Sequence, residues 1–152
     1  MARYASHTSS NGPTYLHHLV WLDNTLDDPD NEGNIDRLRE IDETTRTFTD
    51  RKKCLAYLNE LNERNTKSYV MFIVSRALCE KVIPKIADHS CILAIFIFCS
   101  ESERNNQLES DMVTICTNID MLVYRIVSCI GRDTSSMDYK LLSMPNTTEA
   151  GK

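Results

Sequence analysis

Glycine is scarce in this chain of 152 residues, and its scarcity restricts the chemistry that the sequence can support. The chain has four glycines, Gly12, Gly33, Gly131 and Gly151, and none of them forms a glycine-rich turn directly after an apolar run. Dinucleotide and P-loop sites need such a turn because the backbone must approach the phosphates closely. A serine nucleophile at a strand-to-helix turn also needs flanking glycines, which Ser75 lacks. The sequence therefore disfavours these three kinds of site.

A basic surface and a long apolar run are also missing. The chain has 17 Lys and Arg against 22 Asp and Glu, for a formal net charge of -5. This balance argues against nucleic acid as a partner, because phosphate binding requires a basic surface. The longest apolar run, 91–99, is much shorter than the roughly 20 residues of a membrane helix. The first residues show no apolar core of a signal peptide, so we expect a cytoplasmic location without membrane contact.

Paired cysteines are absent as well. The six cysteines are Cys54, Cys79, Cys91, Cys99, Cys116 and Cys129. No two of them form a CxxC pair, and each lies in an apolar pattern, so zinc binding and a disulfide framework are disfavoured. We expect reduced thiols in the core.

Apolar and β-branched segments predict strands near residues 17–22, 45–49, 69–74, 91–99 and 112–116. The runs 69–74 and 91–99 do not alternate polar with apolar residues, which is typical of strands buried on both faces. Segments with apolar residues at helical spacing follow the strands. This alternation predicts an α/β fold with a five-stranded, doubly wound parallel sheet of the flavodoxin type, in the order 2-1-3-4-5.

Several residues predict where the helices begin and end. Asp50 and Ser75 each precede a helical pattern and can cap it, and Ser100 opens a capping box before a short polar helix toward Leu108. Pro84 should kink its helix or end it early. Gly131 lies where a helix-ending glycine is expected in the last helix.

The chain has the length of one domain. Residues 1–15 are rich in Ser and Asn and lack periodicity, so we expect a flexible N-terminus. Residues 16–131 form the predicted α/β domain. Residues 132–152 are aperiodic and predict a polar tail or a linker.

Ligands of doubly wound sheets bind beyond the carboxyl ends of the strands, near the point where the strand order reverses. The candidate binding residues at this rim are Asp23, Asn24, Ser75, Arg76, Ser100 and Thr117. Arg76 could hold an anion near the helix N-termini, but we expect it to pair with Asp23 across the rim. Asp23, Asp27 and Asp28 are candidates for binding a metal ion such as Mg²⁺; otherwise we expect no cofactor.

The architecture resembles a response-regulator receiver domain. The resemblance implies an acid after strand one, which Asp23 supplies, and a hydroxyl after strand four, which Ser100 supplies. The phosphate-accepting Asp of that family belongs at the end of strand three, where this chain has Ser75 and Arg76. The family's Lys after strand five is replaced by Thr117. The resemblance therefore implies a pseudo-receiver without phosphorelay chemistry.

A second resemblance rests on a run of motifs between residues 19 and 122. The motifs are LVWLD (19–23), TFTD (47–50) with the helix at 54–57, VMFIVSRALCEKVIPKI (70–86), IFIFCSESERN (95–105) and CTNIDML (116–122). They are similar to a receiver-like module of invertebrate multidomain proteins, where it precedes tetratricopeptide repeats or an arginine-type mono-ADP-ribosyltransferase domain. The resemblance implies a signalling or protein-interaction module without a catalytic role, regulatory toward an attached or partner domain.

Two catalytic alternatives remain open. Asp23 could act as a phosphoacceptor that depends on a divalent ion. Glu80, which follows Cys79 in the helix after strand three, could act in an NAD-consuming enzyme of the Toll/interleukin-receptor type. An exposed helical glutamate is the simpler interpretation of Glu80.

Overall fold

The computed structural model describes residues 16–64 and 68–133. The predicted flexible N-terminus at 1–15 lies outside these residues, as does the predicted tail from 134 onward. The strands are β1 (Leu16–Leu22), β2 (Arg46–Phe48), β3 (Ser68–Ser75), β4 (Ile92–Phe98) and β5 (Val113–Cys116). The α-helices are α2 (Glu32–Ile41), α3 (Arg51–Glu63), α4 (Arg76–Ile86) and α5 (Ile119–Asp133), and the 3₁₀ turns are η1 (Pro29–Asn31), η2 (Glu101–Glu103) and η3 (Asn106–Leu108).

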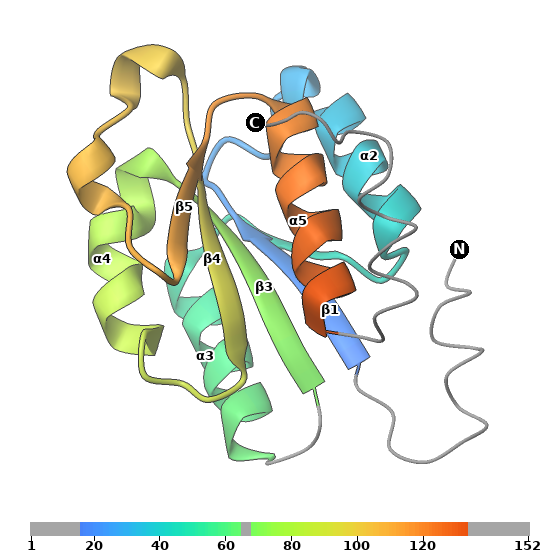
Figure 1. Ribbon diagram of the computed structural model, residues 1–152, viewed down its shortest axis with the longest axis vertical. Coiled ribbons are helices and arrows are strands. Elements are labelled where there is room, and N and C mark those ends of the chain that lie inside the picture. Colours follow the sequence, from blue (N-terminus) through green and yellow to red (C-terminus); the bar gives the residue numbers. More distant parts are fainter. Residues whose placement is uncertain (1–15, 65–67, 134–152) are drawn as a thin grey trace.

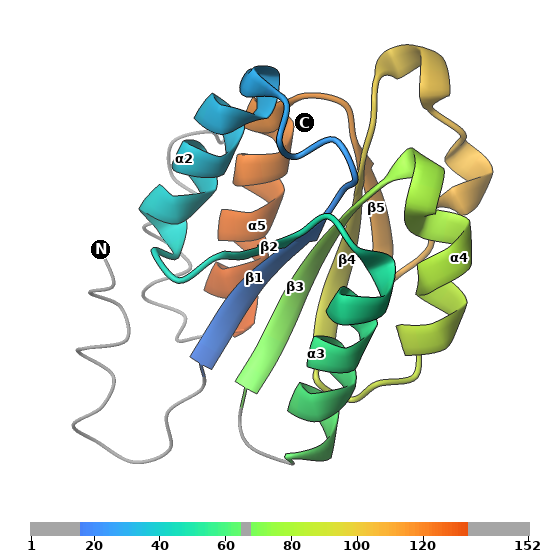
Figure 2. The ribbon, with the colours of Figure 1, turned by 180° about the vertical axis from the view of Figure 1, so that it is seen from behind.

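The five strands form one parallel sheet in the order β2-β1-β3-β4-β5. Helices α2 and α5 cover one face of the sheet, and α3 and α4 cover the other (Figures 1 and 2). The predicted α/β, flavodoxin-like arrangement is thereby confirmed, including the strand order. The order reverses between β1 and β3, whose ends meet because Leu22 lies opposite Val74.

Each central strand contributes side chains to two separate hydrophobic clusters, one on each face of the sheet. In β1, Val20 and Leu22 belong to the cluster under α3 and α4, whereas Leu19 and Trp21 belong to the cluster under α2 and α5. All four side chains are fully buried. Burial on both faces explains why these strands are continuously apolar in the sequence.

Two of the predicted helix starts are confirmed. The Asp50 carboxylate accepts a hydrogen bond from the Lys52 N–H at 2.8 Å and caps α3. In the capping box, the Ser100 N–H donates to Glu103 Oε1 at 3.1 Å. The helix predicted beyond Ser100 is instead two short 3₁₀ turns, η2 and η3. This segment has Leu108 as its one apolar residue, so it offers no apolar face that could stabilise a longer helix by packing.

The ends of two other helices differ from the predictions. Ser75 occupies the N-cap position of α4, but its hydroxyl makes no capping hydrogen bond. Helix α5 continues through the buried Gly131 to Asp133. Packing of the apolar face of α5 outweighs the cost of about 1 kcal/mol that a glycine imposes inside a helix. Pro84 lies inside α4, which ends two residues later, at Ile86, in agreement with the predicted early end.

All six cysteines lie in the described residues, and none is in a disulfide. Five are buried and Cys129 is half-buried, which confirms the predicted reduced thiols in the core. Within residues 16–64 and 68–133, no helix is both long enough and apolar enough to cross a membrane.

Candidate functional site

The carboxyl ends of the parallel strands define one edge of the sheet, where the candidate rim residues lie. Asp23 and Asn24 follow β1, Ser75 ends β3 and Arg76 begins α4. Ser100 and Thr117 lie on the connections that follow β4 and β5. Asp23 and Ser75 are buried, Arg76 and Thr117 are half-buried, and Asn24 and Ser100 are exposed.

Asp23 orders the turn that leaves β1. Its side chain is only 7% exposed, and Oδ1 accepts hydrogen bonds from the Thr25 N–H at 2.9 Å and the Thr25 hydroxyl at 2.7 Å. The Asp23 N–H donates to the carbonyl oxygen of Phe48 at 3.0 Å, which extends the pairing of β1 with β2. The residue therefore has a structural role, because these bonds fix the start of the loop that leads to α2.

The predicted pairing of Arg76 with Asp23 is wrong. Arg76 Nη1 lies 3.3 Å from Glu80 Oε2, one helical turn further along α4, and 3.7 Å from Cys79 Sγ. Residues four apart on a helix are neighbours, so this local pair forms without bridging two strands. Arg76 thus lies along the surface of α4 rather than across the rim.

Cys79 and Glu80, the two residues after Leu78, have environments that are common for helix residues. The Glu80 side chain is 67% exposed and pairs with Arg76. Burial raises the pKa of the Cys79 thiol, and the nearby Arg76 guanidinium offsets part of this effect. Cys79 therefore stays protonated near neutral pH, whereas a nucleophilic cysteine must be a thiolate.

Ser75 lies beneath an aromatic contact. Trp21 of β1 and Phe98 of β4 meet edge-to-face, with ring centroids 5.6 Å apart and planes at 86°. Because β3 runs between β1 and β4, the two rings meet above β3, where Ser75 lies opposite Phe98. Within residues 16–64 and 68–133, the Ser75 hydroxyl and Trp21 Nε1 are both buried without a hydrogen-bond partner.

The hydroxyls at the far side of the rim are held by the η2 turn. Thr117 Oγ1 donates to Glu101 Oε2 at 2.8 Å, and Ser100 Oγ lies 3.0 Å from Ser102 Oγ. The rim residues therefore do not converge on one site. Asp23 orders the β1–α2 turn, Arg76 pairs along α4, and Thr117 ties the end of β5 to η2.

The acidic residues that were candidates for binding a metal ion do not form a cluster in the described residues. Asp27 and Asp28 are exposed in the β1–α2 loop, and the Asp28 N–H donates to the Thr25 carbonyl oxygen at 3.0 Å. Across the described part of the chain, no three His, Cys, Asp or Glu side chains converge in a way that could hold a metal ion.

Asp42 has a structural role that sequence reasoning missed. Its Oδ2 accepts the Leu19 N–H of β1 at 3.0 Å, beside the short edge strand β2. Its Oδ1 accepts both the N–H and the hydroxyl of Thr44. An Asp followed two residues later by Thr is the signal for such a turn, but its long-range bond to β1 depends on the folded sheet.

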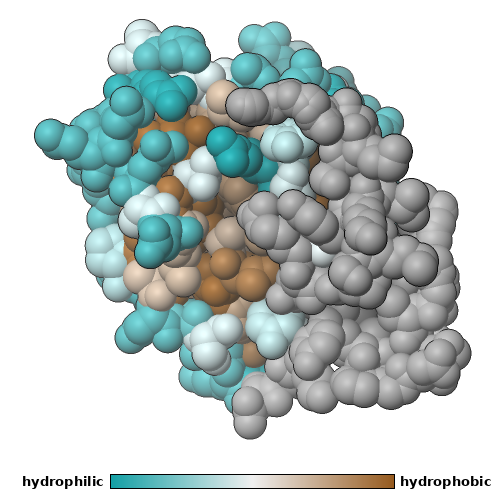
Figure 3. Space-filling view, in the orientation of Figure 1, coloured by the Kyte–Doolittle hydropathy of each residue, from teal (hydrophilic) through white to brown (hydrophobic). Residues whose placement is uncertain are grey.

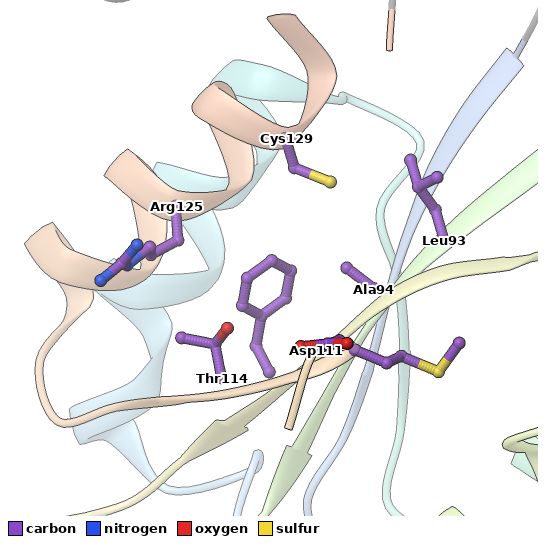
Figure 4. Close-up of a pocket in the computed structure, with 8 residues that line it drawn as sticks. Leu93, Ala94, Asp111, Thr114, Arg125 and Cys129 are labelled. Carbon is purple, nitrogen blue, oxygen red and sulfur yellow. The ribbon is translucent and has the colours of Figure 1, made fainter. Parts of the chain in front are cut away.

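A cavity of about 290 Å³ also went unpredicted. It is lined by strand residues on the α5 side of β4 and β5, by the segment before β5, and by Arg125 and Cys129 of α5 (Figure 4). It was missed because its lining residues come from three segments that the sequence does not place relative to one another. An arginine in the middle of the amphipathic helix α5 was the available signal.

Known proteins provide no further guide to the function of these sites. Comparisons with models of protein families, with curated proteins and with solved structures found no match to the chain.

Proposed function

We propose that the domain is a non-catalytic, receiver-like interaction module that regulates an attached domain or a protein partner. The observation that carries this proposal is the end of β3. A receiver accepts phosphate there on a carboxylate, whereas this chain has a small hydroxyl that is buried beneath Trp21 and Phe98. The next residue, Arg76, is engaged with Glu80 rather than with the rim.

The hydrogen bonds of Asp23 support the same proposal. A divalent ion or a phosphoryl group bound at Oδ1 would compete with the two hydrogen bonds from Thr25. Each such bond contributes about 0.5–1.5 kcal/mol to stability. Ligand binding at this oxygen would thus cost free energy that binding at a carboxylate oxygen without such bonds would not.

The test of the proposal is turnover by the purified chain. We expect no nicotinamide release from NAD at high protein concentration, and no mass increase after incubation with Mg²⁺ and a small acyl-phosphate donor. Nicotinamide release that disappears in Glu80→Gln would establish the NAD-consuming alternative. A phosphoryl adduct that disappears in Asp23→Asn would establish the phosphoacceptor alternative, and either result would overturn the proposal.

A further inference from the structure

The cavity beside α5 is a partly exposed hollow of mixed polarity on a face of the sheet. Its floor contains Phe96, which is buried, and Ala94, which is half-buried, and Leu93 and Met112 line it near the amino ends of β4 and β5. Figure 3 shows apolar residues gathered in the middle of this face, and Figure 4 shows the hollow between α5 and the strands. The cavity therefore lies away from the rim, toward the opposite end of the strands.

Two opposite charges border the cavity. Arg125 lines it from α5, and Asp111 lines it from the segment before β5. Both residues are exposed, and the ion pairs found in the described residues include neither of them. Figure 4 shows the two side chains on different sides of the hollow. The face thus presents one cation and one anion, each outside those ion pairs, around an apolar floor.

An aromatic side chain projects from the same helix. Tyr124, next to Arg125, is 45% exposed and is the one large apolar side chain that is exposed among the described residues. Exposed aromatic residues are typical anchors of protein interfaces. Helix α5 therefore contributes both an exposed aromatic side chain, Tyr124, and a residue that lines the cavity, Arg125.

We propose that this face binds a second copy of the chain in a two-fold symmetric dimer. In such a dimer every contact occurs twice, because a residue that contacts a second residue of the partner is itself matched by the same contact in reverse. A surface that has both members of a matching pair can therefore bind a copy of itself. Tyr124 would enter the partner's cavity, and Arg125 would pair with the partner's Asp111. Each charge then gains an opposite charge, which the ion pairs of the described residues do not give it.

The inference deepens the proposed interaction role, on which it rests, by naming the partner. The two claims can still fail separately. Turnover at the rim would overturn the non-catalytic role without changing the association of the chains. A chain that stays monomeric would overturn the dimer without producing any turnover.

The test is sedimentation equilibrium of the full 152-residue chain over a wide concentration range. We expect a monomer–dimer equilibrium that Arg125→Glu weakens at least about tenfold, because each dimer then has two repulsive pairs of acids. Asp111→Arg should weaken it similarly. The double variant with Arg125→Glu and Asp111→Arg should regain most of the association, because the exchanged charges attract again.

The matched control is Lys53→Glu, an equal change of charge at an exposed position of α3, on the other face of the sheet. It should leave the dimerisation constant within about twofold of the original value, because α3 lies far outside the proposed interface. Circular dichroism of each variant verifies that it is folded. A monomer at every concentration, or a dimer that neither single charge reversal weakens, would overturn the inference, as would a double variant no stronger than the single ones.

Discussion

Ser75, at the end of β3, is a buried polar residue of the rim. Its side chain is 9% exposed, and within the described residues its hydroxyl has no hydrogen-bond partner beneath the Trp21–Phe98 contact. An unpaired buried hydroxyl costs about 1–3 kcal/mol, because it has lost its hydrogen bonds to water. The small size of Ser75 accounts for its place here better than its polarity does, because a larger side chain would separate the two rings.

Replacing Ser75 by alanine tests this account of the residue. The change Ser75→Ala removes the unpaired hydroxyl and leaves room for the rings, so the free energy of unfolding should stay equal or rise by up to about 1 kcal/mol. If the hydroxyl capped α4 in solution, the same change would lower the free energy of unfolding by about 1 kcal/mol. Urea unfolding followed by circular dichroism shows whether the free energy of unfolding rises or falls.

At the level of single residues, sequence reasoning located the rim but not its contacts. Asp23, Ser75 and Thr117 lie at the strand ends where they were expected, because strand ends follow from the apolar pattern. The partners of these side chains do not follow from it. Arg76 was expected to pair with Asp23 across the rim, and its pairing with Glu80 instead depends on side-chain geometry that only the folded chain defines.

At the scale of the helices, caps were predictable where a local residue pair defines them. The Asp50 cap needs only Asp50 and the N–H of Lys52, and it is present at 2.8 Å. The ends of α5 and of the segment after Ser100 were not predictable in this way. They depend on whether an apolar face can pack: α5 has one and runs past Gly131, whereas the polar segment after Ser100 forms only short 3₁₀ turns.

The Asp50 cap gives a prediction for α3. The change Asp50→Ala should lower the free energy of unfolding by about 1 kcal/mol, because it leaves an N–H at the helix start without its partner. Asp50→Ser should retain most of the stability, since the serine hydroxyl can accept the same hydrogen bond. Urea midpoints of the two variants, compared at equal unfolding slopes, measure the effect; equal losses in both would show that the cap is not what Asp50 contributes.

At the scale of the whole molecule, the fold was largely readable from the sequence. Two long apolar strands buried on both faces and helices between the strands leave few arrangements open, and the order β2-β1-β3-β4-β5 is the one found. The cavity beside α5 was not predictable from the sequence, because β4, β5 and α5 come together only in the folded chain. The architecture thus presents a rim where Asp23, Arg76 and Thr117 have local partners and, on a separate face, a hollow bordered by two opposite charges.

The central proposal is that the rim of this flavodoxin-like sheet holds no reactive metal or phosphate site. Amide NMR of the ¹⁵N-labelled chain during titration with Mg²⁺, alone and with a beryllofluoride phosphoryl analogue, tests it most directly. We expect the amide signals of residues 23–25 and of residues 75 and 76 to stay in place up to millimolar Mg²⁺. Saturable shifts of these signals that are absent in Asp23→Asn would contradict the claim and establish a working acceptor site at the rim.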